Sequence, residues 1–269
     1  MAQIKLVASD LDHTLLRPTG VLAEATVGLL QQLAASGIDF VPVSGRDLPT
    51  LLALLPGAEW VIAHNGAVVA RRGRVIQARL LAKDTVKALI NQADALGALP
   101  VLCRLNGAEL LTGHAEASAQ LRQFFLRVTE VSAFTRLDDV AKVTLLVSPS
   151  RLAAVQTAIT AQFGAVLQVT AGEADALGIT DARVNKGSAL TALCQRLHVP
   201  LAQVLAFGDA QNDAPMLQAA GFGMRMADGD PALAGVTGLV APPNAEKGVD
   251  RVLKQLIDDH GTLSQSKGV

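Results

Sequence analysis

The chain has 269 residues, of which 50% are hydrophobic and 17% charged, a composition that supports a buried core and excludes a mainly disordered chain. Its 23 Lys and Arg residues nearly balance its 24 Asp and Glu residues, and aromatic residues make up only 3%. We therefore expect neither nucleic acid nor a membrane as a partner. The cysteines Cys103 and Cys194 lie far apart and outside any metal-binding spacing, and no apolar run is long enough to cross a bilayer, so we expect a soluble cytoplasmic protein.

The chain begins with an alternation of apolar strands and helices. We predict strands at 4–9, 38–43 and 60–63, helices at 23–35 and 49–55, and a hairpin at 67–79 that turns at Gly73. Strand, helix and strand at this spacing indicate parallel strands joined by right-handed crossovers.

The middle of the chain, from about residue 82, has a different pattern. Its predicted strands lie at 101–105, 109–112, 142–147, 165–169 and 176–179, and its predicted helices at 84–96, 115–128 and 150–162. Paired strands between helices favour an α+β unit with a largely antiparallel sheet and helices on one face.

The first pattern then returns, with helices at 186–197, 214–219 and 246–258 and strands at 204–207 and 222–225. The whole chain therefore predicts an α/β fold: a doubly wound, Rossmann-like core with a parallel sheet, made by residues 1–81 and 183–269, and an inserted α+β cap domain at 82–182.

Three predicted parallel strands end in polar residues. The segments are Asp10-Leu11-Asp12, Ser44-Gly45-Arg46 and Gly208-Asp209-Ala210-Gln211-Asn212-Asp213. Ligands bind outside the carboxyl ends of the strands in an open parallel sheet, so we expect these segments to meet at one site. Four acidic side chains, Asp10, Asp12, Asp209 and Asp213, would repel one another there unless a hard divalent cation such as Mg²⁺ were present.

The other residues of this edge suit a phosphate group. Ser44 supplies a donor, and Lys186 supplies positive charge at the expected start of a helix. The set describes phosphoryl transfer to a carboxylate, in which Asp10 attacks phosphorus and Asp12 acts as general acid and base. Each short motif alone is more simply a helix cap, a turn or a solvated charge, but their combination at strand ends and a helix start favours a site.

These motifs resemble those of the haloacid dehalogenase-like superfamily. Asp10-Leu11-Asp12-His13-Thr14 is similar to the first motif, Ser44-Gly45-Arg46 to the second, Lys186 to the third and Gly208 to Asp213 to the fourth. The inserted α+β segment resembles the class IIB cap of the Cof-type sugar-phosphate phosphatases, and Asn65-Gly66-Ala67 and Glu246-Lys247-Gly248-Val249 also resemble that branch.

The resemblance implies a role for each matching residue. Asp10 would form an aspartyl-phosphate and ligate Mg²⁺, while Asp12 would offer its backbone carbonyl to the metal. Asp209 would ligate the metal, and Asp213 would hold it directly or through water. Phosphate or substrate would contact Ser44, Gly45, Arg46, Lys186 and Asn212, and Thr14 would support the loop. His13 and Ala210 stand where glycine is more usual; His13 could face the substrate or point outward, and Ala210 implies that no positive φ is needed there.

We therefore expect a Mg²⁺-dependent phosphatase that acts on a small phosphorylated metabolite, with sugar phosphates as the expected class. A phosphomutase that passes the phosphoryl group to a second sugar hydroxyl is an alternative. A non-catalytic regulatory module that holds phospho-Asp10 as a signal is another, although Asp12 and the inserted cap argue against it.

Overall fold

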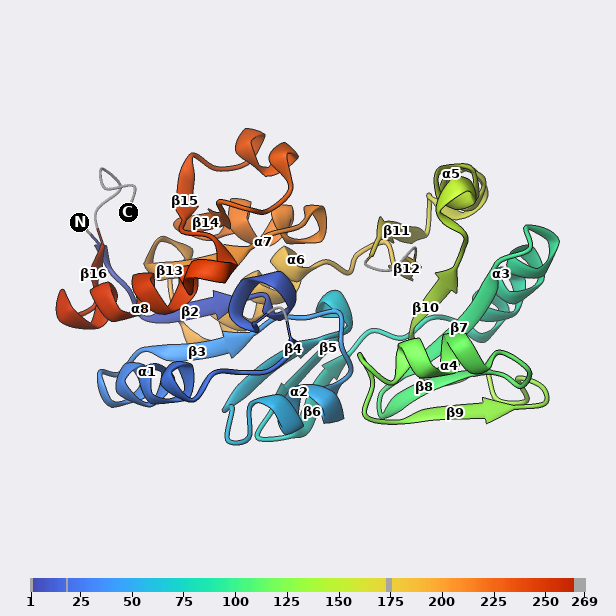
Figure 1. Ribbon diagram of the computed structural model, residues 1–269, viewed down its shortest axis with the longest axis horizontal. Helices are drawn as coiled ribbons and strands as arrows, with labels where there is room; N and C mark the ends of the chain where they lie inside the picture. Colours follow the sequence, from blue (N-terminus) through green and yellow to red (C-terminus); the bar gives the residue numbers. More distant parts are fainter. Residues whose placement is uncertain (1, 18, 173–175, 264–269) are drawn as a thin grey trace.

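The computed structural model describes all residues except 1, 18, 173–175 and 264–269. Its central element is a five-stranded parallel sheet in the order β15-β14-β13-β2-β3, which Figure 1 shows beside a second unit of the chain. The strands are β2 (Leu6–Ser9), β3 (Asp39–Pro42), β13 (Val204–Gly208), β14 (Phe222–Met226) and β15 (Leu239–Ala241). The predicted α/β class with a parallel sheet is confirmed.

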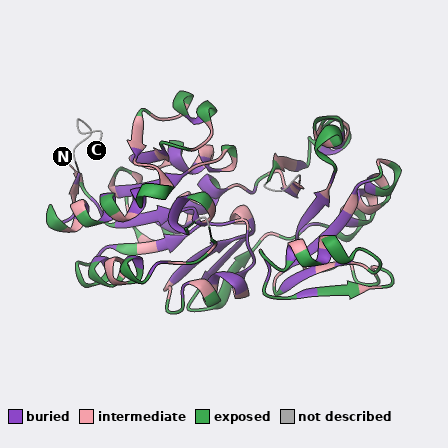
Figure 2. Cartoon of the chain, viewed as in Figure 1, coloured by how far each residue is buried: buried purple, intermediate pink, exposed green. Residues whose placement is uncertain are grey.

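Alternate residues of the sheet strands pack on opposite faces, as the period of a strand requires. Val7 and Phe207 join the cluster that includes residues of α1 (Glu24–Ala35) and α8 (Gly248–Asp258). Leu6 and Ala206 join the opposite cluster with α6 (Lys186–Leu197) and α7 (Ala214–Ala219). Helices therefore cover both faces, and β2 and β13 are buried along their length (Figure 2).

The strand predicted at 60–63 does not extend the parallel sheet. It is β4 (Trp60–Ala63), which forms a separate antiparallel sheet with β5 (Val68–Arg71) and β6 (Arg74–Ala78). A single parallel bridge, between Val43 and Ile62, joins it to the end of β3. A tight turn after β4 makes it pair with β5 as an antiparallel hairpin. Helix α2 (Leu48–Leu54) lies between β3 and β4 in the chain.

The second unit, here called the cap, is a six-stranded sheet in the order β11-β12-β10-β7-β8-β9. The strands are β7 (Leu99–Arg104), β8 (Gly107–Leu111), β9 (Val128–Val131), β10 (Val140–Leu146), β11 (Leu167–Ala171) and β12 (Ala176–Asp181). Among the described residues of the cap, β8 and β9 are the one parallel pair and the other neighbouring strands are antiparallel, so the sheet is largely antiparallel as predicted. The division at residues 82 and 182 stays a prediction; both positions lie in segments that join the cap to the parallel-sheet core.

The cap helices do not all lie on one face of its sheet. Helices α3 (Lys83–Ala95) and α5 (Leu152–Phe163) share a cluster with Leu102 and Val143, whereas α4 (Ala115–Leu121) shares one with Val101 and Cys103. Since neighbouring residues of a strand point to opposite faces, α4 lies on the other face of the sheet. The one-face prediction is therefore wrong.

The helix predicted at 115–128 is also too long. Helix α4 ends at Leu121, and the amides of Phe124 and Phe125 both bond to the Leu121 carbonyl in tight turns. The β-branched residues that follow then pair as β9 with β8. The loop 122–126 consequently holds two aromatic side chains next to the cavity described below.

The remaining strands, β1 (Ala2–Gln3) and β16 (Thr262–Leu263), form a short antiparallel pair. Within the described part of the chain, no helix is both long and apolar enough to cross a membrane.

Candidate active site

The loop after β2 carries the first motif in a fixed and unusual conformation. Residues Leu11–Leu15 form a single wide turn in which His13 has φ of 57°, a left-handed value that explains why glycine is favoured there. The Thr14 hydroxyl donates to Asp209 Oδ1 at 2.8 Å, and the Asn244 amide donates to the Thr14 carbonyl at 2.7 Å. The predicted support by Thr14 is therefore a direct link between the first and fourth motifs, and His13 lines the cavity.

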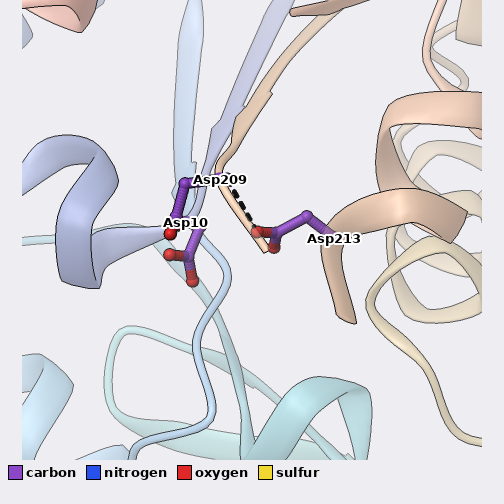
Figure 3. A group of neighbouring side chains, drawn as sticks. All are labelled: Asp10, Asp209 and Asp213. Atoms are coloured by element: carbon purple, nitrogen blue, oxygen red, sulfur yellow. Dashed lines mark hydrogen bonds between the residues drawn. The ribbon is translucent and has the colours of Figure 1, made fainter. Parts of the chain in front are cut away.

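Three of the four predicted acidic side chains meet at one point (Figure 3). Oxygen atoms of Asp10, Asp209 and Asp213 all lie within 4.8 Å of one another. Asp10 follows β2 and Asp209 follows β13, and these strands are neighbours in the sheet. The Asp12 side chain lies outside this group and pairs with Arg46 instead. This agrees with a role for Asp12 at the metal that uses its backbone carbonyl only.

Asp213 is held firmly by the chain. Its Oδ2 accepts the backbone N–H groups of Asp209 and Ala210, each at 3.0 Å, and its Oδ1 accepts Lys186 Nζ at 2.5 Å. Ala210 has φ of −124°, so this position needs no glycine. Because both oxygens already accept protein donors, the geometry suits contact with a metal through water.

Lys186 reaches the carboxylates from the first turn of α6. The helix begins with a capping box, in which the Asn185 side chain accepts the Ser188 N–H at 2.7 Å and the Ser188 hydroxyl accepts the Asn185 N–H. Lys186 Nζ donates to both Asp10 and Asp213, and its side chain is only 1% exposed. The structure thus places this cation beside the predicted nucleophile.

The electrostatics of the group reflect burial and crowding. Burial raises the pKa of Asp10 well above its usual value; Lys186 opposes this, and Asp213 and Asp209 add to it. Burial and the Asp213 charge likewise raise the pKa of Asp209. Burial alone would lower the pKa of Lys186, but Asp10 and Asp213 outweigh it and raise that pKa. One buried ammonium therefore faces three acidic groups.

This excess of acidic oxygen atoms fits a divalent cation. The cluster offers only carboxylate oxygens, which are hard ligands of the kind that Mg²⁺ prefers, and it has no described sulfur or imidazole ligand. Asp10 and Asp209 would hold the ion directly, with the Asp12 carbonyl beside them. A bound dication would offset the repulsion that raises the two pKa values.

The second motif forms the opposite wall. Ser44 is buried, lines the cavity and accepts the Arg46 N–H through Oγ at 3.2 Å. Gly45 lies against Asn65, whose amide oxygen accepts Asn212 Nδ2 at 3.3 Å. Gly45, Arg46 and Asn212 also line the cavity, so four of the five predicted phosphate- or substrate-binding residues meet there. The fifth, Lys186, reaches Asp10 but is not among the residues that line the cavity.

Comparison with known proteins agrees with this geometry. Residues 7–253 match the family model described as haloacid dehalogenase-like hydrolase. The chain belongs to this family. It is 28% identical over 240 residues to the HMP-PP phosphatase of Cronobacter sakazakii, covering 85% of this chain and 86% of that protein. It is 27% identical to the 5-amino-6-(5-phospho-D-ribitylamino)uracil phosphatase YbjI of Escherichia coli, covering 93% and 97% of the two chains.

Solved structures share the complete fold of this haloacid dehalogenase-like hydrolase. SMU.1108c of Streptococcus mutans superposes with a TM-score of 0.89 at 25% identity, covering 95% of this chain and 99% of that one. The HAD subclass IIB sugar phosphatase BT4131 superposes with a TM-score of 0.80 at 18% identity, covering 94% and 98%. The second likeness shows the fold alone.

Between the core and cap of the hydrolase lies a cavity of about 380 Å³. The core side carries the acidic residues, and the cap side combines apolar side chains with polar ones. Sequence reasoning missed the cap residues of this wall, which include Leu121, Phe124, Phe125, Lys142, Thr144 and Leu146. Lys142 had a detectable signal, because it is the one charged residue in a predicted strand that is otherwise mostly apolar.

Gly208 has no room for a side chain. A Cβ there would lie 2.5 Å from Asp213 Cγ and 2.7 Å from its Oδ2. We expect Gly208→Ala to displace the Asp213 carboxylate, to lower the free energy of unfolding by about 1–3 kcal/mol and to reduce turnover. Denaturant unfolding measures the first effect. The matched control is Gly28→Ala in α1, where a Cβ meets nothing within 4 Å; equal stability of the two variants would contradict the prediction.

Proposed function

We propose that the protein is a Mg²⁺-dependent phosphatase that hydrolyses small phosphate monoesters through an aspartyl-phosphate on Asp10. The observation that carries this proposal is the position of Asp10, which lines the core side of the cavity and whose carboxylate meets Lys186, Asp209 and Asp213. The relatives from Cronobacter sakazakii and Escherichia coli are phosphatases of small phosphorylated metabolites, which supports the reaction class.

The chain's own residues supply the steps. An Asp10 oxygen attacks phosphorus, and the bond between phosphorus and the ester oxygen breaks as protonated Asp12 gives that oxygen a proton. Asp12, now a carboxylate, takes a proton from water as the water oxygen attacks phosphorus, and the acyl phosphate bond breaks to release phosphate and Asp10. Lys186 orients Asp10 and balances charge near the transferring group. When bound, Mg²⁺ supplies positive charge that favours approach of the phosphate to the carboxylates.

For the leaving group, we propose a small cyclic metabolite with sugar phosphates as the first class to test. The cavity volume suits one ring, and the sugar phosphatase BT4131 shares the fold of this chain. The Escherichia coli relative is a phosphatase of a phosphorylated ribitylaminouracil, so the panel must include phosphorylated heterocycles too.

A phosphate-release screen tests the proposal. Purified protein is incubated with sugar phosphates, nucleotides, phosphorylated pyrimidines and flavin phosphate, with Mg²⁺ or with EDTA. We expect turnover of at least one monoester that EDTA abolishes. Absence of turnover across the panel, together with a phospho-Asp10 lifetime of many minutes, would favour the regulatory module. An isomerised sugar phosphate among the products would favour the phosphomutase.

Mg²⁺ should also stabilise the folded chain, because it binds a site that the unfolded chain lacks. At about 100 times its dissociation constant, we expect an increase of about 2.7 kcal/mol in the free energy of unfolding. Asp209→Asn should lose most of this increase, whereas Asp258→Asn, at an exposed position of α8, should keep it. Denaturant titrations with and without Mg²⁺ measure the difference, and an unchanged response in Asp209→Asn would exclude Asp209 as a ligand.

A further inference from the structure

Three hydrogen bonds join the second-motif segment, residues 44–50, to the cap. Arg46 Nη1 donates to the Gln123 carbonyl at 3.0 Å, and Lys142 Nζ donates to the Gly45 carbonyl at 2.8 Å. The Leu126 N–H donates to Thr50 Oγ1 at 2.9 Å. Two of these hydrogen bonds involve the loop 122–126, so the segment 44–50 holds this loop against the core.

The Arg46 guanidinium also binds Asp12 with two parallel hydrogen bonds. Nε donates to Oδ2 at 2.8 Å and Nη2 to Oδ1 at 2.6 Å. The guanidinium carbon lies 5.2 Å from the centre of the Phe124 ring, on the same cap loop. Each of the three Arg46 nitrogens therefore contacts either the acid–base residue of the proposed mechanism or the cap.

We propose that Arg46 is a positioning residue that orients Asp12 for proton transfer and does so when the cap loop 122–126 lies against the core. The inference rests on the proposed function, in which Asp12 gives a proton to the ester oxygen. It differs from the substrate-binding role predicted for Arg46 from the sequence, because its bonds run to Asp12 and to the cap.

The planar fork explains why arginine is needed here. Two parallel bonds define the plane and rotation of the Asp12 carboxyl group, which a single point charge cannot do. When Asp12 carries the proton for the leaving group, one of its oxygens becomes a hydrogen-bond donor. Only the other oxygen then still accepts a hydrogen bond from Arg46. The Gln123 carbonyl and the Phe124 ring then hold the guanidinium in place. Without the cap contacts, the long Arg46 side chain has more freedom and orients Asp12 less well.

Leaving-group dependence tests this role. Nitrophenolate leaves without a proton, whereas phenolate benefits from one, and kcat/KM covers the steps up to loss of the leaving group. For Arg46→Lys, we expect kcat/KM to fall by roughly 100-fold with phenyl phosphate but by less than about 5-fold with 4-nitrophenyl phosphate. A substrate-binding role predicts equal losses with the two esters, which would overturn the inference.

A double-mutant comparison separates positioning from structural damage. If Arg46 acts through Asp12, then Arg46→Lys should have little further effect on kcat/KM in an Asp12→Asn background. Independent losses that multiply would contradict the proposal. The matched control is Arg71→Lys, because Arg71 also pairs with a carboxylate, that of Glu59 at 2.7 Å, and lies 5.2 Å from an aromatic ring, that of Trp60. Arg71 is not among the residues that line the cavity. This control should leave both kcat/KM values unchanged.

The link to the cap is tested at Thr50, which touches the loop but lies outside the cavity lining. Thr50→Val removes the acceptor for the Leu126 N–H and keeps the shape of the side chain. We expect the same selective loss with phenyl phosphate, at a smaller factor than in Arg46→Lys. If Thr50→Val has the same kcat/KM as the wild type with both esters, the contact between the cap loop and the core does not affect Asp12, and this part of the proposal is wrong. If the wild type releases no phosphate from any monoester, the proposed function fails; if it does but the selectivity is absent, only this inference fails.

Discussion

Replacing Asp10 by Asn should abolish phosphate release while the chain stays folded. An amide cannot form the acyl phosphate, so we expect kcat to fall by at least about 1000-fold with every substrate that the wild type accepts. Lys186 keeps Asp213 as a partner in this variant, at 2.5 Å in the present structure. Continuous phosphate assays with Mg²⁺ measure the loss.

The same variant should not be less stable without metal. Burial raises the pKa of Asp10, so its charged form is destabilised in the folded chain at pH values above its unfolded pKa. A neutral amide removes that cost, and we expect the free energy of unfolding at pH 7 with EDTA to be equal to or above that of the wild type. A variant that is inactive because it is unfolded would contradict this, and so would one that keeps more than a few per cent of the wild-type rate.

Removing the charge of Lys186 should have the largest effect on stability. Lys186→Met leaves Asp10 and Asp213 buried without their shared cation, at a site where the lysine side chain is 1% exposed. Loss of one partner of a buried ion pair costs about 3–5 kcal/mol, and we expect a loss of this size in EDTA. Denaturant unfolding at pH 7 measures it.

Two comparisons isolate the cause. Adding Asp213→Asn to Lys186→Met should recover part of the lost stability, because it removes one unpaired charge. Lys254→Met on α8, where the lysine is 70% exposed and pairs with Asp258, should change stability by less than about 0.5 kcal/mol. If Lys186→Met is as stable as the Lys254 control, the buried ion pair does not stabilise the fold.

Local chemistry along the chain determined most of the core and of the acidic cluster. Apolar strands such as β2 and β13 end in aspartate, and parallel strands present their carboxyl ends at one edge, so Asp10 and Asp209 could be placed together before any coordinates. The start of α6 at Lys186 was also predicted, and the structure shows its local cause, a capping box formed by Asn185 and Ser188.

Only the tertiary structure decided which cap residues line the cavity together with those carboxylates and which groups Arg46 contacts. Helix α4 ends at Leu121 because its last turn tightens, and β9 then pairs in parallel with β8, the strand that precedes α4, a partner that no local pattern specifies. The bonds of Arg46 to Asp12 and to the Gln123 carbonyl join segments that are 34 and 77 residues apart. Contacts at such separations depend on how the two units close on each other, whereas strand ends and helix caps depend on neighbours in the chain.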